Sequence, residues 1–223
     1  MSISLKAVIF DLDGTLINSA IQFDKMKRKI IAFLQASGVT PGLLNESLLN
    51  IEIIKLAVSD LQKKGFSEKQ IGEILSQVSD IMSEVELESV DDASLIEDVP
   101  KTLSSLKLRG LKLGVMTRSC REYVQRLFNK FGLDIFFDAV AARDDVSEPK
   151  PSPEHAFHLL SILGVKPEET LFVGDHWSDA ECANKAGLKF VFISYRNGME
   201  KVHKLGYKTI NKLDELVKII NTF

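Results

Sequence analysis

A regular alternation of short apolar runs and helical stretches after Pro100 constrains the fold most strongly. Short apolar runs bounded by turn residues are typical of β-strands, and apolar residues at helical spacing fill the stretches between them. The predicted strands are residues 111–116, 136–142, 170–174, 189–194 and one near 208. The first predicted helix begins at Pro100, and the later ones cover about 120–131, 153–163, 178–186 and a segment that ends near 221. Such alternation builds a mostly parallel sheet covered on both faces, which is an α/β fold.

One earlier strand, residues 5–10, is separated from strand 111–116 by a long helical region. One amphipathic face is expected from Met26, Ile30, Phe33 and Leu34, a second helical stretch contains Leu48, Ile51, Leu56 and Val58, and a third stretch is marked by Ile71, Ile74, Leu75, Val78, Ile81, Met82 and Val85. The third stretch begins with Ser67 to Gln70, which has the form of a capping box. We therefore expect an α/β core of residues 1–16 and 98–223 and an inserted helical domain of residues 17–97.

The composition excludes several classes of protein. A net charge of −3 argues against nucleic acid or an anionic membrane surface as the main partner, and a chain of 223 residues can bury a sizeable core. No apolar run is long enough to span a membrane, and the first residues lack the pattern of a signal peptide. Cys120 and Cys182 stand far apart, which favours two reduced thiols. These features are typical of a cytoplasmic protein with a small-molecule partner.

Polar residues follow four of the predicted segments at one edge of the sheet. They are Asp11 and Asp13 after strand 5–10, Thr117, Arg118 and Ser119 after strand 111–116, Lys150 after strand 136–142, and Asp175 and Asp179 after strand 170–174. Ligands of such sheets bind beyond the carboxyl ends of the strands. Carboxylates can act as a nucleophile, a proton donor and ligands of a divalent cation, while a hydroxyl and an ammonium can bind phosphate oxygens. The residues therefore indicate phosphoryl transfer.

In this order and spacing, the segments VIFDLDGTL, VMTRS, EPKPSPE and VGDHWSDAECANKAG resemble the four signature motifs of the haloacid dehalogenase superfamily. The helical insert after the first motif resembles the α-helical cap of the phosphoglycolate phosphatase and β-phosphoglucomutase branch, and the resemblance implies a Rossmann-like α/β core with that cap. The resemblance implies a Mg²⁺-dependent phosphatase that hydrolyses a small soluble phosphate monoester, such as phosphoglycolate or a sugar phosphate, through an aspartyl-phosphate.

The resemblance also implies a role for each of these residues. Asp11 would be the nucleophile and Asp13 the general acid and base, while Thr117 and Lys150 would hold the phosphoryl group. The Mg²⁺ ligands would come from Asp11, Asp13 through its backbone carbonyl, Asp175 and Asp179. Candidate substrate contacts are Gly14, Arg118 and His176.

Several alternatives stay open at this point. Arg118 could grip an anionic part of the substrate or dock the helical insert, and His176 with Trp177 could touch the leaving group or simply pack locally. Ser119 is expected to cap a helix, and His155 and His158 to be a half-exposed pair rather than metal ligands. A sugar phosphomutase, or a catalytically silent binding or regulatory protein, is the alternative function. The oligomeric state is not predicted.

Overall fold

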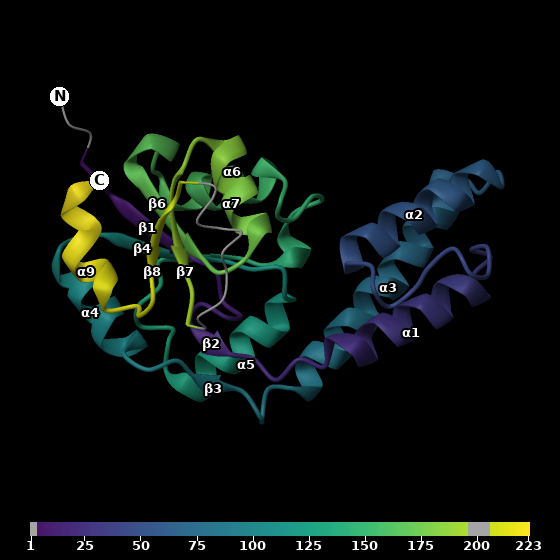
Figure 1. Cartoon of the computed structure of the whole chain (residues 1–223), viewed down its shortest axis with the longest axis horizontal. Coiled ribbons are helices and arrows are strands. Elements are labelled where there is room, and N and C mark those ends of the chain that lie inside the picture. Colours follow the sequence, from purple (N-terminus) through teal and green to yellow (C-terminus); the bar gives the residue numbers. More distant parts are fainter. Residues whose placement is uncertain (1–3, 196–205) are drawn as a thin grey trace. The chain divides into compact units, whose positions relative to one another are not determined.

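The computed structural model describes residues 4–195 and 206–223, which form two compact units (Figure 1). The core unit comprises residues 1–19 and 92–223, and the helical unit comprises residues 20–91. The sequence predicts domain boundaries after residues 16 and 97. Those boundaries, taken as the limits of independently folding domains, stay predictions. None of the described helices combines the length and the apolar character needed to cross a bilayer.

The described part of the core unit contains one parallel sheet, as the sequence predicts. Its six strands are β1 (Ala7–Phe10), β4 (Lys112–Met116), β5 (Ala139–Ala141), β6 (Thr170–Gly174), β7 (Lys189–Ile193) and β8 (Lys208–Ile210). The strand order β5-β4-β1-β6-β7-β8 places β1 between β4 and β6. Strand β5 is shorter than the predicted 136–142, because Phe136 and Phe137 belong to the loop before it and the Phe137 ring packs on Phe128.

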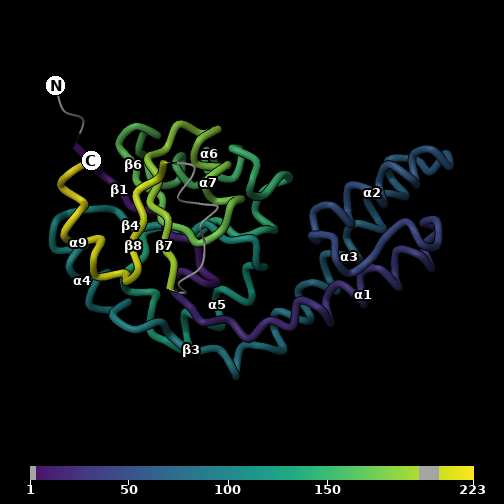
Figure 2. Tube along the Cα trace, viewed as in Figure 1, coloured from purple at the N-terminus to yellow at the C-terminus, as the bar shows by residue number. Residues whose placement is uncertain are grey.

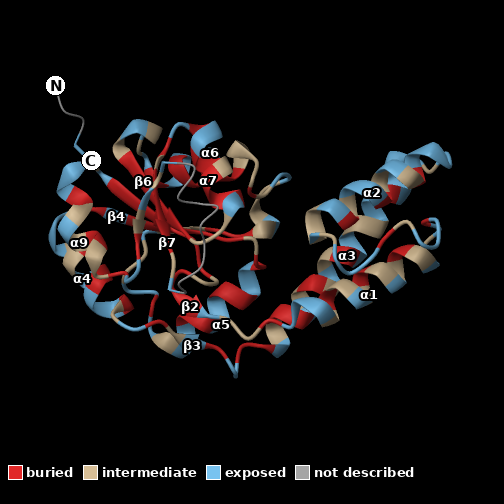
Figure 3. Ribbon diagram, viewed as in Figure 1, coloured by how far each residue is buried: buried red, intermediate tan, exposed pale blue. Residues whose placement is uncertain are grey.

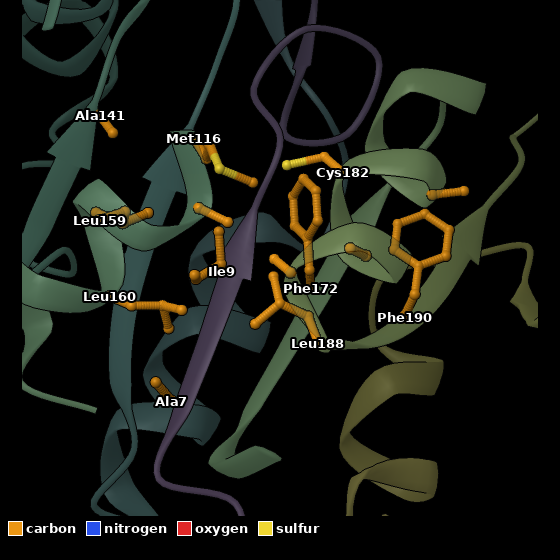
Figure 4. Close-up of a cluster of buried hydrophobic side chains, with 14 of the residues drawn as sticks. Ala7, Ile9, Met116, Ala141, Leu159, Leu160, Phe172, Cys182, Leu188 and Phe190 are labelled. Carbon is orange, nitrogen blue, oxygen red and sulfur yellow. The ribbon is translucent and has the colours of Figure 1, made fainter. Parts of the chain in front are cut away.

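Helices cover the sheet on both faces. The α-helices among the described residues of the core unit are α4 (Val99–Leu108), α5 (Arg121–Phe131), α6 (Pro153–Leu163), α7 (Trp177–Ala186) and α9 (Glu215–Ile219). On one face, α6 and α7 pack on an apolar cluster that includes Ala7 and Ile9 of β1 and Phe172 of β6 (Figure 4). Because strand side chains alternate, Phe10 points to the opposite face, where its ring meets Phe137. Strand β1 is therefore buried on both sides, as Figure 3 shows for the centre of the sheet.

A short antiparallel pair, β2 (Ile17–Asn18) and β3 (Ser94–Leu95), was not predicted. Both segments fall in the region expected to be helical, and strands of two residues are too short to show an alternating pattern. The chain passes from β2 through α1–α3 and returns at β3, as the trace in Figure 2 shows. The amide of Ile96 donates to the carbonyl of Leu16, which extends this connection.

The helical unit contains α1 (Phe23–Ala36), α2 (Asn50–Lys63) and α3 (Glu68–Glu88), which confirms a helical insertion. The buried faces of α1 and α3 follow the prediction, and Ser67 and Gln70 form the predicted capping box. In α2 the buried residues are Ile53, Ala57 and Leu61, whereas Leu56 is 38% exposed. This stretch carries apolar residues at two competing helical spacings, and packing against α1 and α3 selects one of them.

Candidate active site

The pairing of β1 brings three functional segments to one edge of the sheet. Phe10, the last residue of β1, pairs with Val115 of β4 and with Val173 of β6. The amide of Asp11 then donates to the carbonyl of Val173 at 2.9 Å. Asp11, Thr117 and Asp175 consequently follow three neighbouring strands at nearly the same level, beyond their carboxyl ends, where ligands bind in sheets of this kind.

Lys150 places a buried ammonium between two carboxylates. Its Nζ donates to Asp11 Oδ1 at 2.5 Å and to Asp179 Oδ1 at 2.7 Å, and the residue is 1% exposed. Burial lowers the pKa of Lys150, but the charges of Asp11 and Asp179 outweigh burial and raise that pKa above its ordinary value. The ammonium therefore stays charged at physiological pH and fixes one oxygen of each acid.

Asp11, Asp175 and Asp179 form a compact group of acids. Each offers a carboxylate oxygen, and these atoms lie within 4.8 Å of one another. Burial raises the pKa of Asp11 well above its usual range, and the charges of Asp179 and Asp175 add to this effect. The Lys150 charge acts in the opposite direction but does not outweigh burial. Burial and Asp179 raise the pKa of Asp175 to about 7. Three acids facing one ammonium leave negative charge uncompensated, and carboxylate oxygens are the preferred ligands of Mg²⁺. The donor set fits a divalent cation.

Two glycines make room for these acids. A Cβ atom on Gly14 would lie 2.1 Å from Asp175 Oδ2, and one on Gly174 would lie 2.5 Å from Asp179 Oδ2. Gly14 also has a φ of +86°, which side chains disfavour. The Gly14 amide donates to the carbonyl of Ile17 at 2.8 Å. The contribution of Gly14 that the structure shows is the space that the Asp175 carboxylate occupies. A contact of Gly14 with substrate stays a prediction.

Asp13 has different surroundings from Asp11. Its Oδ2 accepts a hydrogen bond of 2.7 Å from Ser119 Oγ, and its Oδ1 accepts one of 2.9 Å from the Tyr123 hydroxyl. The expectation that Ser119 caps a helix was wrong, because α5 begins one residue later and Cys120 occupies the N-cap position. Tyr123 was missed, since nothing in the sequence relates it to Asp13. Two acids in unlike environments can take different chemical roles.

Thr117 is buried at the end of β4. Its amide donates to the carbonyl of Ala141 at 3.0 Å, and its Oγ1 accepts a bond of 3.1 Å from the Ser119 amide. Arg118, which follows, is half-buried, and its carbonyl accepts a bond of 3.0 Å from Arg143 Nη1. The backbone of this segment is thereby fixed, and whether the Arg118 side chain meets a substrate stays a prediction.

His155 links Lys150 to Thr117, and the expectation of a half-exposed residue was wrong because α6 packs this position against the sheet. Its Nδ1 accepts from the Lys150 amide at 3.2 Å, so the ring proton lies on Nε2, which donates to Ala141 O at 3.1 Å. The same carbonyl accepts from Thr117. Burial and the Lys150 charge lower the pKa of His155 to about 3, so the ring is neutral.

His176 occupies the N-cap of α7. Its Nδ1 accepts from the Ser178 amide at 3.3 Å, and its own amide donates to Asp179 Oδ2 at 3.0 Å. The rings of His176 and Trp177 lie 5.5 Å apart, and Trp177 is 40% exposed. These contacts give His176 a local packing role and help to hold Asp179. Its contact with substrate stays a prediction.

Comparison with known proteins gives one consistent family. Residues 8–193 match the family model of haloacid dehalogenase-like hydrolases. The chain is 30% identical over 227 residues to pyrophosphatase PpaX of Bacillus mycoides, covering 97% of each chain. It is 27% identical over 219 residues to a phosphoglycolate phosphatase of Aquifex aeolicus, again covering 97% of each. A solved structure of a predicted phosphoglycolate phosphatase from Haemophilus somnus is 25% identical, with a TM-score of 0.63 over 96% of this chain and 97% of that one.

The family match spans the segments that bring Asp11, Thr117, Lys150 and Asp175 together, and it extends through the helical unit. The relatives are matched over nearly their whole length. The chain therefore belongs to the haloacid dehalogenase-like hydrolases.

Proposed function

We propose that this protein is a Mg²⁺-dependent phosphatase that hydrolyses a small phosphate monoester through an aspartyl-phosphate on Asp11. The observation that carries the proposal is the Lys150 ammonium held between Asp11 and Asp179, beside Asp175. A phosphoryl group brings negative charge to a nucleophile that is itself an anion, so the site must supply positive charge. Lys150 supplies part of that charge from within the protein.

Asp11 would act as the nucleophile. Lys150 Nζ donates to its Oδ1, and the other carboxylate oxygen, Oδ2, would be the atom that attacks phosphorus. Attack forms the bond between Asp11 and phosphorus and breaks the bond to the leaving oxygen. The Thr117 hydroxyl and the Lys150 ammonium would then bind phosphoryl oxygens, because both lie at the same edge of the sheet.

Asp13 serves as acid and then as base. In the first step its carboxyl proton moves to the leaving oxygen, which departs as an alcohol. In the second step water attacks the phosphorus of the aspartyl-phosphate and gives a proton to Asp13, and Asp11 is restored as inorganic phosphate leaves. Mg²⁺ held by Asp11, Asp175 and Asp179, together with the Asp13 carbonyl that the family resemblance implies, would neutralise charge between the nucleophile and the phosphoryl group.

The identity of the substrate is a narrower question. Among the relatives above, one is named a pyrophosphatase and another a phosphoglycolate phosphatase. Pyrophosphate therefore joins phosphoglycolate and the sugar phosphates as a candidate, although the sequence alone did not suggest it. Cleavage of pyrophosphate would use the same attack by Asp11 and differ only in the leaving group, which is a phosphate instead of an alkoxide.

The experiment is phosphate release from phosphoglycolate, pyrophosphate and common sugar phosphates, with Mg²⁺ and with a chelator. Asp11→Asn keeps the size of the side chain and removes the nucleophile, so release is expected to fall by about 10³-fold or more. The matched control is Asp80→Asn, which makes the same change at an exposed position of α3. Isomerised sugar phosphate without free phosphate would instead indicate a mutase. No turnover of any compound by a folded, Mg²⁺-binding protein would contradict the proposal.

A further inference from the structure

We propose that Tyr123 is a positioning residue that holds the carboxyl group of Asp13 for proton transfer. This inference rests on the proposed function, in which Asp13 gives a proton to the leaving oxygen. It concerns a residue that lies 110 positions from Asp13 in the sequence and comes from a different element, helix α5.

The geometry gives each oxygen of Asp13 its own hydroxyl donor. Tyr123, on the first turn of α5, donates to Oδ1 at 2.9 Å, and Ser119, just before that helix, donates to Oδ2 at 2.7 Å. Tyr123 is fully buried, so its ring cannot move without disturbing the packing around it. Two donors on two oxygens fix both the place and the plane of the carboxyl group.

The tyrosine hydroxyl contributes something that its ring does not. A phenylalanine would fill nearly the same space, so packing alone does not require the hydroxyl at this buried position. Negative charge develops on Asp13 as its proton moves to the leaving oxygen. Hydroxyl donors already in place strengthen as that charge appears, because a hydrogen bond to an anion is stronger than one to a neutral group. The Tyr123 hydroxyl should therefore favour proton transfer.

This role makes the effect of Tyr123 depend on the leaving group. An alkoxide is a strong base and departs only with a proton, so its departure needs Asp13. A nitrophenolate departs as an anion and needs almost no help. A residue that acts through Asp13 matters for the first class of ester, whereas a residue that only supports the fold matters equally for both.

The test compares wild type and Tyr123→Phe in saturating Mg²⁺, using kcat/KM for a series from nitrophenyl phosphate through phenyl phosphate to alkyl phosphates. This ratio reports the steps up to phosphorylation of Asp11 and excludes later attack by water. We expect a loss of about tenfold for alkyl esters, the effect of one charge-assisted hydrogen bond, and less than about twofold for nitrophenyl phosphate. Ser119→Ala provides a second variant with the same expected pattern.

The matched control is Tyr207→Phe, which removes a phenol hydroxyl from a ring that packs on Phe190 in the core unit, away from Asp13. It should leave the whole series unchanged. Equal losses across all esters in Tyr123→Phe and Ser119→Ala, or no loss in either, would overturn the positioning role. A wild-type protein that hydrolyses no ester would instead overturn the proposed function, and the inference with it.

Discussion

Lys150 Nζ lies 2.5 Å from Asp11 Oδ1 in a region from which water is almost excluded. The same Nζ also donates to a second carboxylate, Asp179, whose Oδ1 lies 2.7 Å away. Moving such charges out of water costs several kcal/mol for each ion, so the arrangement is unfavourable unless every charge has a partner. The relationship links stability to function, because the ammonium that offsets negative charge on Asp11 is also the group proposed to bind the phosphoryl oxygens.

Replacing Lys150 by methionine should therefore destabilise the protein as well as inactivate it. The change keeps the length of the side chain but leaves Asp11 and Asp179 buried without a counter-charge, at a cost of about 3 kcal/mol. Chemical denaturation in a chelator measures this loss, and added Mg²⁺ should restore part of it. Lys185→Met is the control, because its partner Glu181 lies at the surface and such pairs contribute little. Equal losses in the two variants would contradict the account.

Gly14→Ala should weaken Mg²⁺ binding. The new Cβ would overlap with Asp175 Oδ2 and displace a carboxylate of the three-acid group. Gly65→Ala is a close control: its φ of +83° nearly equals the +86° of Gly14, but a Cβ there meets nothing within 4 Å. Both variants should lose about 1 kcal/mol of stability from backbone strain. Only Gly14→Ala should need more Mg²⁺ for half-maximal activity, and an unchanged requirement would show that Gly14 does not seat Asp175.

His155 should give the stability a distinct pH dependence. The folded ring has a pKa of about 3, whereas 6.5 is the ordinary value expected after unfolding. Between these values the unfolded chain binds the extra proton, so this contribution to the free energy of unfolding falls as the pH falls from 6.5 towards 3. The limiting slope is about 1.4 kcal/mol per pH unit.

His155→Gln isolates this effect from the acids of the site, which titrate in both proteins. The measurement is the free energy of unfolding against pH for both proteins in a chelator. The difference between wild type and variant should shrink as the pH falls below 6.5. A difference that is constant between pH 7 and pH 4 would contradict a buried, neutral His155.

The sequence predicted the sheet and the residues at its edge because both depend on local patterns. Strand β1 is a continuous apolar run, and residues after parallel strands must meet at one edge whatever the details of packing. Contacts between distant residues follow no such rule. Tyr123 meets Asp13 only because α5 begins directly after β4, and His155 is buried only because α6 packs against the sheet. Likewise, the buried face of α2 depends on the helices beside it.

The central claim is that Asp11 carries the phosphoryl group, and the most direct measurement is to trap that intermediate. The wild type is mixed with a turned-over ester and Mg²⁺ and quenched in acid within one turnover, and its peptides are analysed by mass spectrometry, with Asp11→Asn as control. One added phosphoryl group is expected on Asp11 in the wild type and none in the variant. Phosphate release at the full rate without labelling of Asp11 would contradict the central claim.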